Sequence, residues 1–556
     1  MFVFICTMVQ AVPLVKHVSQ VELQALQHVP SNMCSASTIA AMLTASVPAG
    51  VATTRYGIVF DAGSSGSRIH VYSWSTGGGG PKNDFNLIDD DLLKIKPGLS
   101  AYKDDPGAAG ASLRPLLEHA KKRIPPALVS SAPAFLMATA GLRMVGEAKK
   151  DAILASVCTE LAASGFTFKC EWATLLSGQD EGLFGWVTVN YLLDRLYPPP
   201  ASEPVGTIDL GGGSVQIVFT TPGADRAPPG YVQRLDFSGR KHGVYVKSHL
   251  GYGLDAARGA LLDQLMKHAH DDRPAKHPCL PRGASVTHKE VVFVGDGDWA
   301  RCVRATLKLF DTTTACEAPP CSFGGAYQPP LPPVFYGFSY MYDRTAAIGL
   351  LDGKPAVFGT QQMTTEAIAA AGEKVCALDK PTTAERFAAA ADAPKADNFC
   401  GDVAYIVALL RSLGFSSTAP LTMTNKIKGV ELVWTLGAML AKSAELAAGH
   451  GSSGSSAGGG GSGGGGLPMR TILLVASGAA LLLWLCGSGR LNVGYHPVQH
   501  EGSGKARPLY TVAPAAARSR DDPTSHLTAT QTHLFCARAR ALGPTSNSHP
   551  RQAPLR

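Results

Sequence analysis

The chain has 556 residues, of which 45% are hydrophobic and 17% charged, so it is long enough for two or three globular domains with substantial cores. Its formal net charge is +7, but residues 488–556 hold nine Lys and Arg against three Asp and Glu, so most of the excess lies in that final segment. The rest of the chain is close to neutral, which argues against a nucleic-acid-binding surface on the folded part.

Residues 1–53 predict a targeting segment. Residues 1–12 are apolar but lack a basic n-region, whereas residues 36–52 form an uncharged apolar stretch rich in small residues. This second stretch could be the h-region and cleavage zone of a signal peptide that starts at Met33, or it could be an uncleaved anchor. Either alternative sends the following domain into a lumen or outside the cell.

The predicted folded part opens with a strand, a tight loop and a second strand around Asp61. A short apolar run ends in this aspartate, a Gly/Ser turn follows, and a second run alternates apolar with polar residues. We expect glycine at Gly63 and Gly66 because a backbone with positive φ, or one that approaches a ligand closely, excludes a Cβ atom. The N–H groups of the turn and the hydroxyls of Ser64, Ser65 and Ser67 would form a concavity for phosphate oxygens, and the aspartate could hold a metal ion through water. Alternatively, the segment is an ordinary hairpin with a polar turn.

The next part of the chain predicts alternating helices and strands. Helices are predicted over residues 109–124, 148–163 and 178–193, a strand leading into a loop and helix start over residues 134–143, and a strand over residues 166–172. Asp180 and Glu181 stand where the third of these helices begins. A hydrolase of phosphoanhydrides needs a base that orients and deprotonates water, and either carboxylate could supply it. Both could instead simply favour the helix N-terminus through its dipole.

A second hairpin repeats the pattern of the first. Residues 205–219 contain an apolar run, Asp209, a Gly/Ser loop and an alternating apolar run. Two such hairpins predict two related lobes, each of which offers a phosphate loop to a shared cleft. A phosphate chain with a bridging divalent ion needs this kind of clamp, because charge on several oxygens must be neutralised at once. The alternative is two unrelated hairpins.

The following segment predicts helices separated by irregular structure. A Gly-punctuated loop leading into a helix is predicted over residues 249–258, a loop-rich region over residues 268–335, and helices over residues 402–413 and 428–447.

The C-terminal part predicts a membrane anchor. Residues 448–466 are mostly Gly and Ser, which is typical of a flexible linker. Residues 467–487 include an uncharged apolar run of about 16 residues, which as a helix spans about 24 Å and is short for a bilayer core of about 30 Å. We interpret residues 467–487 as a transmembrane helix rather than a buried core helix, because the linker and the basic segment leave no partner domain. The Lys and Arg excess places residues 488–556, a predicted disordered tail, in the cytoplasm.

The cysteines predict disulfide bonds. Twelve are present, and those between residues 158 and 400 lack the CxxC spacing of zinc sites. Their spacing suggests four local pairs: Cys158 with Cys170, Cys279 with Cys302, Cys316 with Cys321, and Cys376 with Cys400. Such pairs would form in an oxidising compartment. The alternative is eight buried free thiols in a cytosolic enzyme.

Five motifs in order carry a resemblance to a known family. They are IVFDAGSSGSR (58–68), ATAGLR (138–143), LSGQDEGLFGWVTVNYL (176–192), IDLGGGSVQI (208–217) and IKGVELVWTLGAML (427–440). One such motif is a weak signal, but five in the same order over this length are a strong one. Over residues 55–447 the chain resembles the ecto-nucleoside triphosphate diphosphohydrolases, the apyrases.

The resemblance implies an α/β fold and an activity. The fold would consist of two ribonuclease-H-like, actin-like lobes with the active-site cleft between them: lobe I over residues 54–177, completed by residues 430–447, and lobe II over residues 178–429. The activity would be Ca²⁺- or Mg²⁺-dependent hydrolysis of the terminal phosphates of nucleoside tri- and diphosphates by direct attack of water, without a phosphoenzyme. With the single C-terminal span, the catalytic domain would lie in the Golgi lumen or outside the cell. The resemblance sets no oligomeric state.

The resemblance also assigns roles to individual residues. Glu181 would be the base that acts on water, Gln216 would help to place that water, and Asp61 and Asp209 would hold the metal ion through its waters. The residues implied at the phosphates or the nucleotide are Gly63, Ser64, Ser65, Gly66, Thr139, Gly211, Gly212, Gly213, Ser214, Tyr342 and Trp434. The family tends to carry a pair of tyrosines where this chain has Tyr342 followed by Asp343, so the contact with the base departs from the pattern. Apart from Tyr342, the stretch of residues 335–342 could instead form a buried strand.

Two other classes of function are compatible with the phosphate loops. One is another enzyme of the same superfamily, such as a sugar kinase, a chaperone-type ATPase or an exopolyphosphatase. The other is a nucleotide-binding receptor or adhesion ectodomain without turnover, against which the presence of Glu181 and Gln216 argues.

Overall fold

The computed structural model describes residues 53–63, 66–77, 82, 84–199, 202–267, 274–316, 318–349, 359–390 and 392–451. The predicted targeting segment up to residue 52, the transmembrane helix at 467–487 and the tail at 488–556 lie outside these residues. Within the described ranges, no helix is both long enough and apolar enough to cross a membrane.

A first sheet has five strands in the order β3-β2-β1-β4-β5. The strands are β1 (Thr53–Ala62), β2 (Ser67–Thr76), β3 (Asn86–Ile95), β4 (Ala134–Ala138) and β5 (Ala173–Leu175). The first hairpin is antiparallel, and β4 runs parallel to β1 with Ala138 opposite Ala62. The carboxyl ends of β1 and β4 therefore meet at one edge, where Asp61 and Thr139 lie.

A second sheet has seven strands in the order β14-β15-β13-β6-β7-β9-β8. The strands are β6 (Gly206–Leu210), β7 (Ser214–Thr220), β8 (Val232–Phe237), β9 (Arg240–Leu250), β13 (Phe335–Ser339), β14 (Gln361–Thr364) and β15 (Pro420–Met423). The hairpin of β6 and β7 is antiparallel, and β13 runs parallel to β6 with Phe338 opposite Asp209. Each large sheet thus pairs a hairpin with a parallel strand at its acidic end.

The smaller elements complete the second part of the chain. A three-stranded sheet contains β10 (Ala275–His277), β11 (Ser285–His288) and β12 (Val291–Gly295), and a two-stranded sheet contains β16 (Lys426–Ile427) and β17 (Val430–Glu431). The helices here are α9 (Leu254–Met266), α10 (Trp299–Leu307), α11 (Tyr340–Ile348), α12 (Thr365–Ala377), α13 (Lys380–Arg386) and α14 (Phe399–Ser412).

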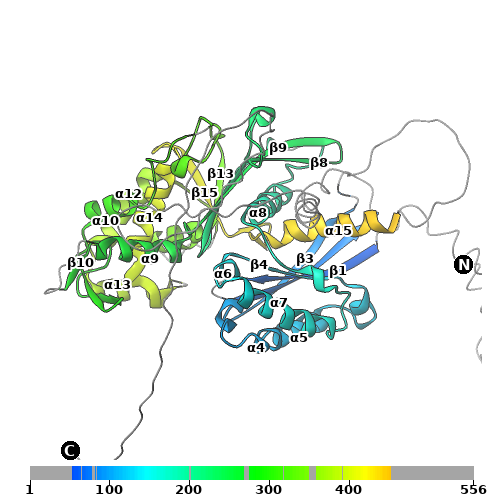
Figure 1. Ribbon diagram of the computed structural model, residues 1–556. Coiled ribbons are helices and arrows are strands. Elements are labelled where there is room, and N and C mark those ends of the chain that lie inside the picture. The colour runs from blue at the N-terminus through cyan, green and yellow to red at the C-terminus, as the bar shows by residue number, and fades with distance from the viewer. Residues whose placement is uncertain are drawn as a thin grey trace, which may run out of the picture. The chain divides into compact units, whose positions relative to one another are not determined.

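Helices cover both faces of the first sheet (Figure 1). These are α4 (Gly107–Ala111), α5 (Arg114–Arg123), α6 (Ala140–Arg143), α7 (Glu147–Ala162), α8 (Gly178–Leu192) and α15 (Thr435–Gly451). Successive residues of a strand point to opposite faces. Accordingly Ile58 and Phe60 of β1 pack in one core with α5 and α7, whereas Val59 packs in another with α8 and α15.

The core around α8 and α15 is shared by both large sheets. It contains Val59 of the first sheet, Val218 of the second and Trp186 of α8, all without solvent exposure. The two helices meet closely, because a Cβ atom on Gly437 would lie 2.1 Å from the carbonyl oxygen of Phe184. Glycine at this position is therefore a packing requirement.

Several predicted elements are confirmed, and three are corrected. Both hairpins and the helices predicted over residues 148–163 and 178–193 occur at β1–β2, β6–β7, α7 and α8. The strand predicted over residues 166–172 is wrong: residues Cys170–Trp172 form a short 3-10 helix, and β5 begins only at Ala173. The single helix predicted over residues 109–124 is two helices, since α5 starts anew with Pro115 in its first turn.

The helix predicted from residue 428 begins later and ends later. Lys428 and Gly429 have φ values of 52° and 82° and form the turn between β16 and β17, so the α15 backbone begins at Thr435. The backbone of α15 continues to Gly451, past residue 448 where the linker is predicted to begin.

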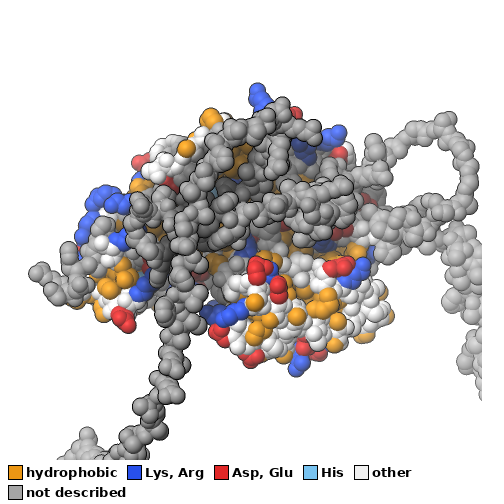
Figure 2. All heavy atoms as spheres, in the orientation of Figure 1, with side chains coloured by type: hydrophobic (Ala, Val, Ile, Leu, Met, Phe, Trp, Pro, Cys, Tyr) orange, Lys and Arg blue, Asp and Glu red, His pale blue; other side chains and the backbone are white. Residues whose placement is uncertain are grey.

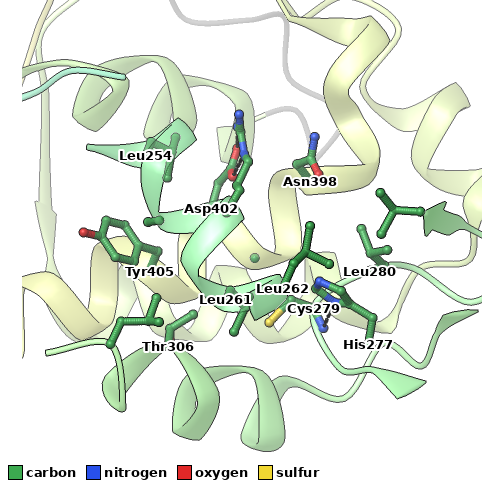
Figure 3. A pocket seen from close by; sticks show the side chains of 15 residues that line it. Leu254, Leu261, Leu262, His277, Cys279, Leu280, Thr306, Asn398, Asp402 and Tyr405 are labelled. Carbon is green, nitrogen blue, oxygen red and sulfur yellow. Dashed lines mark hydrogen bonds and ion pairs between the residues drawn. The ribbon is translucent and has the colours of Figure 1, made fainter. Parts of the chain in front are cut away.

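All four predicted disulfide bonds are present, with Cα–Cα distances of 5.0, 4.9, 5.8 and 4.8 Å in chain order. Near Cys279 lies a cavity of about 60 Å³ walled by apolar side chains of α9 and by His277 and Tyr405 (Figure 3). It is far smaller than the roughly 300–1,000 Å³ of typical ligand sites. On the face seen in Figure 2, side chains of both charges are interspersed over the described residues.

Candidate active site

A cavity of about 370 Å³ lies where the acidic ends of the two hairpins meet. The predicted site residues in its wall are Asp61, Gly63, Thr139, Glu181, Asp209, Gly211, Gly212, Gly213, Ser214 and Trp434. They come from β1, from the loops after β4 and β6, from the first turn of α8 and from the segment before α15. The volume falls within the range of ligand-binding pockets.

Asp61 is held at the end of β1 with one oxygen engaged and one not. Its Cα is paired with that of Arg68 across the hairpin, and Arg68 Nη1 donates to Asp61 Oδ2 at 2.6 Å. The carboxylate is only 3% exposed, and its Oδ1 atom is buried without a hydrogen-bond partner among the described residues. A buried oxygen without a donor is costly, so this atom is available for a ligand.

Asp209 ends β6 in the same cavity wall. It is 8% exposed, and the Ser339 hydroxyl at the end of β13 donates to it. Burial raises its pKa to about 6, the Ser339 hydrogen bond opposes this shift, and the negative charge of Asp61 adds to it. The two hairpins therefore bring their carboxylates close enough to repel each other.

These two carboxylates suit a hard divalent cation. Carboxylates attract Ca²⁺ and Mg²⁺, and a hydrated cation would relieve the repulsion between them, while its waters could donate to the buried Asp61 Oδ1. In the part of the chain that the structure describes, no three His, Cys, Asp or Glu side chains gather as a direct metal-binding group. The residues present thus fit an ion whose shell is completed by water and phosphate oxygens.

Glu181 faces the same space from the first turn of α8. It is 9% exposed and forms an ion pair with Arg143 at the end of α6. Burial raises its pKa to about 8; Arg143 opposes this shift, whereas Asp209 and Asp61 reinforce it. A cation between the two aspartates would offset their charge and lower the pKa of Glu181, which would favour the carboxylate form that can accept a proton.

Gln216 lies behind Glu181 rather than in the cavity wall. It is 1% exposed on β7, and its Nε2 atom is 2.8 Å from Ser214 Oγ and 3.4 Å from Glu181 Oε2. A Cβ atom on Gly182 would lie 2.9 Å from Gln216 Cβ, so the glycine lets α8 approach β7. The structure therefore brings Gln216 to the carboxylate.

The loop of residues 211–214 is fixed from behind by α9. The carbonyls of Gly211 and Gly212 accept hydrogen bonds from Leu254 and Asp255 at 2.9 and 3.0 Å, at the start of this helix. Because these carbonyls are turned toward α9, the loop's other face is left to the cavity.

The first loop differs in part from its prediction. Gly63 does not have a positive φ; instead a Cβ atom there would lie 3.2 Å from the Gly66 carbonyl oxygen. A Cβ atom on Gly66 would lie 2.7 Å from the Ile95 carbonyl oxygen, so Gly66 is required by contact with β3. The predicted phosphate ligands Ser64 and Ser65 lie outside the described residues.

The structure does not bring Tyr342 to the cavity. It is 3% exposed, packs in the core of the second sheet, and its hydroxyl accepts a hydrogen bond from the Gly359 N–H at 3.2 Å. The buried-strand interpretation is confirmed for β13, but a helix begins at Tyr340. In a helix, residues three apart lie on the same face, so Tyr340 shares its face with Asp343 and not with Tyr342. Tyr340 and Asp343 are the residues of α11 that line the cavity.

Sequence reasoning missed much of the cavity's charge. The additional polar wall residues are Arg68, Lys94, Lys96, Asp255, Ser339, Tyr340, Asp343, Asp392, Asn425 and Glu431, with Arg143 beside Glu181. Arg68 and Arg143 end the first and second motifs, so their place in the motifs was a usable signal. The others are brought in by tertiary contacts.

The sequence matches the GDA1/CD39 (nucleoside phosphatase) family over residues 50–451. The chain belongs to this family. It is 33% identical over 428 residues to "Guanosine-diphosphatase" of Schizosaccharomyces pombe, covering 70% of this chain and 74% of the relative. It is 34% identical over 395 residues to "Ectonucleoside triphosphate diphosphohydrolase 6" of Homo sapiens, covering 69% and 76%.

Among solved structures, a nucleoside triphosphate hydrolase from Neospora caninum aligns with a TM-score of 0.52 and 16% identity, covering 73% of this chain and 95% of that one. This likeness concerns the fold, and it confirms the mixed α/β prediction. The family membership confirms the prediction of an apyrase-type nucleoside phosphate hydrolase.

Proposed function

We propose that this GDA1/CD39 family enzyme is a divalent-cation-dependent apyrase. It hydrolyses the terminal phosphates of nucleoside tri- and diphosphates by direct attack of water and releases nucleoside monophosphate and inorganic phosphate. The observation that carries this proposal is the convergence of Asp61, Asp209 and Glu181 on one cavity beside the Gly211–Ser214 loop.

Asp61 and Asp209 are the groups that would hold Ca²⁺ or Mg²⁺, through its waters. When bound, the cation would neutralise negative charge on the phosphate oxygens. Asp61 Oδ1 has no hydrogen-bond partner among the described residues, and the pKa of Asp209 is raised. Both observations support this role, because a nearby positive charge would stabilise each carboxylate.

Glu181 acts as the base that accepts a proton from the attacking water. Arg143 and Gln216 both contact the Oε2 atom of this carboxylate, and Gln216 helps to place the water. This arrangement orients the nucleophile without a covalent step.

The two loops bind the phosphates. The residues proposed for this role are Gly63, Ser64, Ser65, Gly66, Thr139, Gly211, Gly212, Gly213 and Ser214. Backbone N–H groups and hydroxyls can donate to phosphate oxygens there. Trp434 closes the same cavity from the segment before α15.

The proposed enzyme has two ribonuclease-H-like lobes: lobe I comprises residues 54–177 and 430–447, and lobe II comprises residues 178–429. Each large sheet has a hairpin flanked by a parallel strand, which supports a duplicated unit. Four disulfide bonds support an oxidising compartment, so we place the catalytic part in the Golgi lumen or outside the cell, anchored by residues 467–487.

A phosphate-release panel tests the function. Full-length protein is incubated with ATP, ADP, GDP and UDP, with Mg²⁺ or Ca²⁺ and without any acceptor. We expect release of inorganic phosphate with nucleoside monophosphate as the final nucleotide product. Turnover that required a sugar or another acceptor would contradict the proposal and favour a kinase.

A further inference from the structure

One face of α11 points into the cavity and one does not. Tyr340 and Asp343 are three residues apart and both line the cavity, whereas Met341 and Tyr342 are buried in the adjoining core. Residues at this spacing lie one above the other on a helix. The helix therefore presents an aromatic ring and a carboxylate together.

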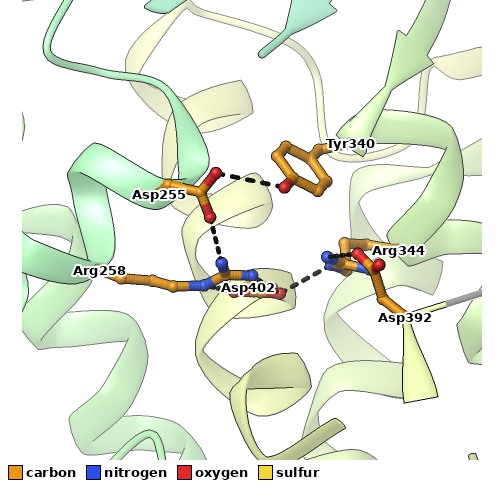
Figure 4. A network of polar contacts seen from close by, with 6 residues as sticks. All are labelled: Asp255, Arg258, Tyr340, Arg344, Asp392 and Asp402. Carbon is orange, nitrogen blue, oxygen red and sulfur yellow. Dashed lines mark hydrogen bonds and ion pairs between the residues drawn. The ribbon is translucent and has the colours of Figure 1, made fainter. Parts of the chain in front are cut away.

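Two other carboxylates of the same wall are already engaged (Figure 4). Asp255 accepts from Arg258 and from the Tyr340 hydroxyl, the latter at 3.3 Å. Asp392 accepts from Arg344 Nη2 at 2.9 Å. Both arginines also donate to Asp402, which is 1% exposed on α14. The network fixes Tyr340 and leaves Asp255 and Asp392 little capacity for a ligand.

Asp343 differs from these two in having no partner. Within the described residues it forms neither a hydrogen bond nor an ion pair. Burial raises its pKa to about 6; the positive charge of Arg344 opposes this shift. A partly buried carboxylate without a donor is costly unless a ligand supplies one.

Asp343 lies away from the cation end of the cavity. Besides Arg344, the charges that act on it are Asp392, Lys94 and Glu431, and the last two form an ion pair at 2.7 Å. In the first sheet, Lys94 on β3 lies opposite Arg68 on β2, which lies opposite Asp61 on β1. Lys94 is therefore two strands away from Asp61, about 10 Å at the usual strand spacing. Ser339, which donates to Asp209, directly precedes α11. Asp343 is four residues further along, a rise of about 6 Å along the helix axis.

This position fits the nucleoside end of the substrate. We propose that Asp343 is a specificity-determining residue that accepts hydrogen bonds from the imino edge of the nucleobase. Guanine presents its N1–H and 2-amino donors side by side, matching two carboxylate oxygens, and uracil presents N3–H. Adenine and cytosine present a ring-nitrogen acceptor at the same place, which a carboxylate repels. The inference rests on the proposed hydrolysis of nucleoside phosphates and adds its base selectivity.

The test compares nucleotides rather than total activity. In full-length protein, kcat/KM is measured for GDP, IDP, UDP, ADP and CDP in the wild type, Asp343→Asn and Asp343→Ser. We expect the wild type to rank GDP above IDP and IDP above ADP, because IDP lacks the 2-amino donor. Both variants should lower the GDP-to-ADP ratio of kcat/KM by about tenfold to a hundredfold, since a site built for a donor discriminates strongly.

Asp392→Asn is the matched control, because Asp392 lines the same wall but is held by Arg344. Its GDP-to-ADP ratio should stay that of the wild type. An equal proportional loss for all five nucleotides in the Asp343 variants would overturn the proposal in favour of a ribose contact or a structural role, and an unchanged ratio would overturn it as well. In either case continued phosphate release would leave the proposed hydrolysis standing, whereas release from none of the nucleotides would refute both.

Discussion

Gly213 and Ala140 touch where the two loop regions of the cavity meet: a Cβ atom added to Gly213 would lie 2.7 Å from Ala140 Cβ. Ala140 follows Thr139 at the start of α6, and Gly213 belongs to the loop after β6. This contact sets the spacing between residues that are proposed to bind the same phosphates.

Gly213→Ala should therefore impair catalysis. An ordinary contact needs at least 3.4 Å, so the loops would have to separate by about 0.7 Å or more, which misplaces the phosphate ligands; overpacking typically costs about 1–3 kcal/mol. We expect kcat/KM to fall about tenfold or more, as measured by phosphate release. Gly259→Ala in α9 is the control, because a Cβ atom there meets nothing within 4 Å, and it should retain wild-type activity. Equal activity of the two variants would refute the tight contact.

Glu181→Gln should leave the fold and nucleotide binding intact and remove most of the activity. Gln cannot accept a proton, and loss of a general base typically costs about a hundredfold or more in kcat. Asp180→Asn is the matched control, since Asp180 caps the same helix with Ser177 but does not line the cavity. Single-turnover phosphate release measures both. A Glu181→Gln enzyme with near-normal turnover would show that this carboxylate is not the base.

Chelation of divalent ions should abolish activity, and Mg²⁺ or Ca²⁺ should restore it. Asp61→Asn and Asp209→Asn should each weaken cation binding, because each removes a negative charge beside the proposed ion. Calorimetric titration of the cation into the protein, with and without a nonhydrolysable nucleotide, measures this directly. Full turnover in excess chelator would contradict the assigned roles of both aspartates.

The parts of the site that could be predicted from the sequence are local. Asp61 and Asp209 each end a strand that turns back within a few residues, so a short pattern identifies their position and loop. The disulfide partners are likewise near in sequence, with separations of 5 to 24 residues. Short-range geometry decides such features, and a single sequence contains it.

The remaining parts depend on contacts between distant segments. Lys94 and Glu431 pair across 337 positions, and neither stands in a pattern that predicts the other. The family resemblance predicts Tyr342 at the nucleotide, but the helix that begins at Tyr340 turns Tyr342 into the core. Short apolar runs leave the choice between strand and helix open, since their periodicity fits both structures.

His249 should make folding stability depend on pH. It is 7% exposed on β9, its ring centroid is 4.3 Å from that of Phe323, and burial lowers its pKa to about 3, with the charge of Lys247 acting in the same direction. The unfolded chain, in which His has a pKa near 6.5, binds a proton between these values that the folded chain does not. The free energy of unfolding is therefore unaffected by His249 above about pH 6.5 and declines as the pH falls toward 3. At pH 5.5 it is lower by about 1.4 kcal/mol. Denaturant unfolding at pH 7.5 and pH 5.5 should show a smaller decline for His249→Phe than for the wild type, and equal declines would mean that His249 is protonated in the folded protein.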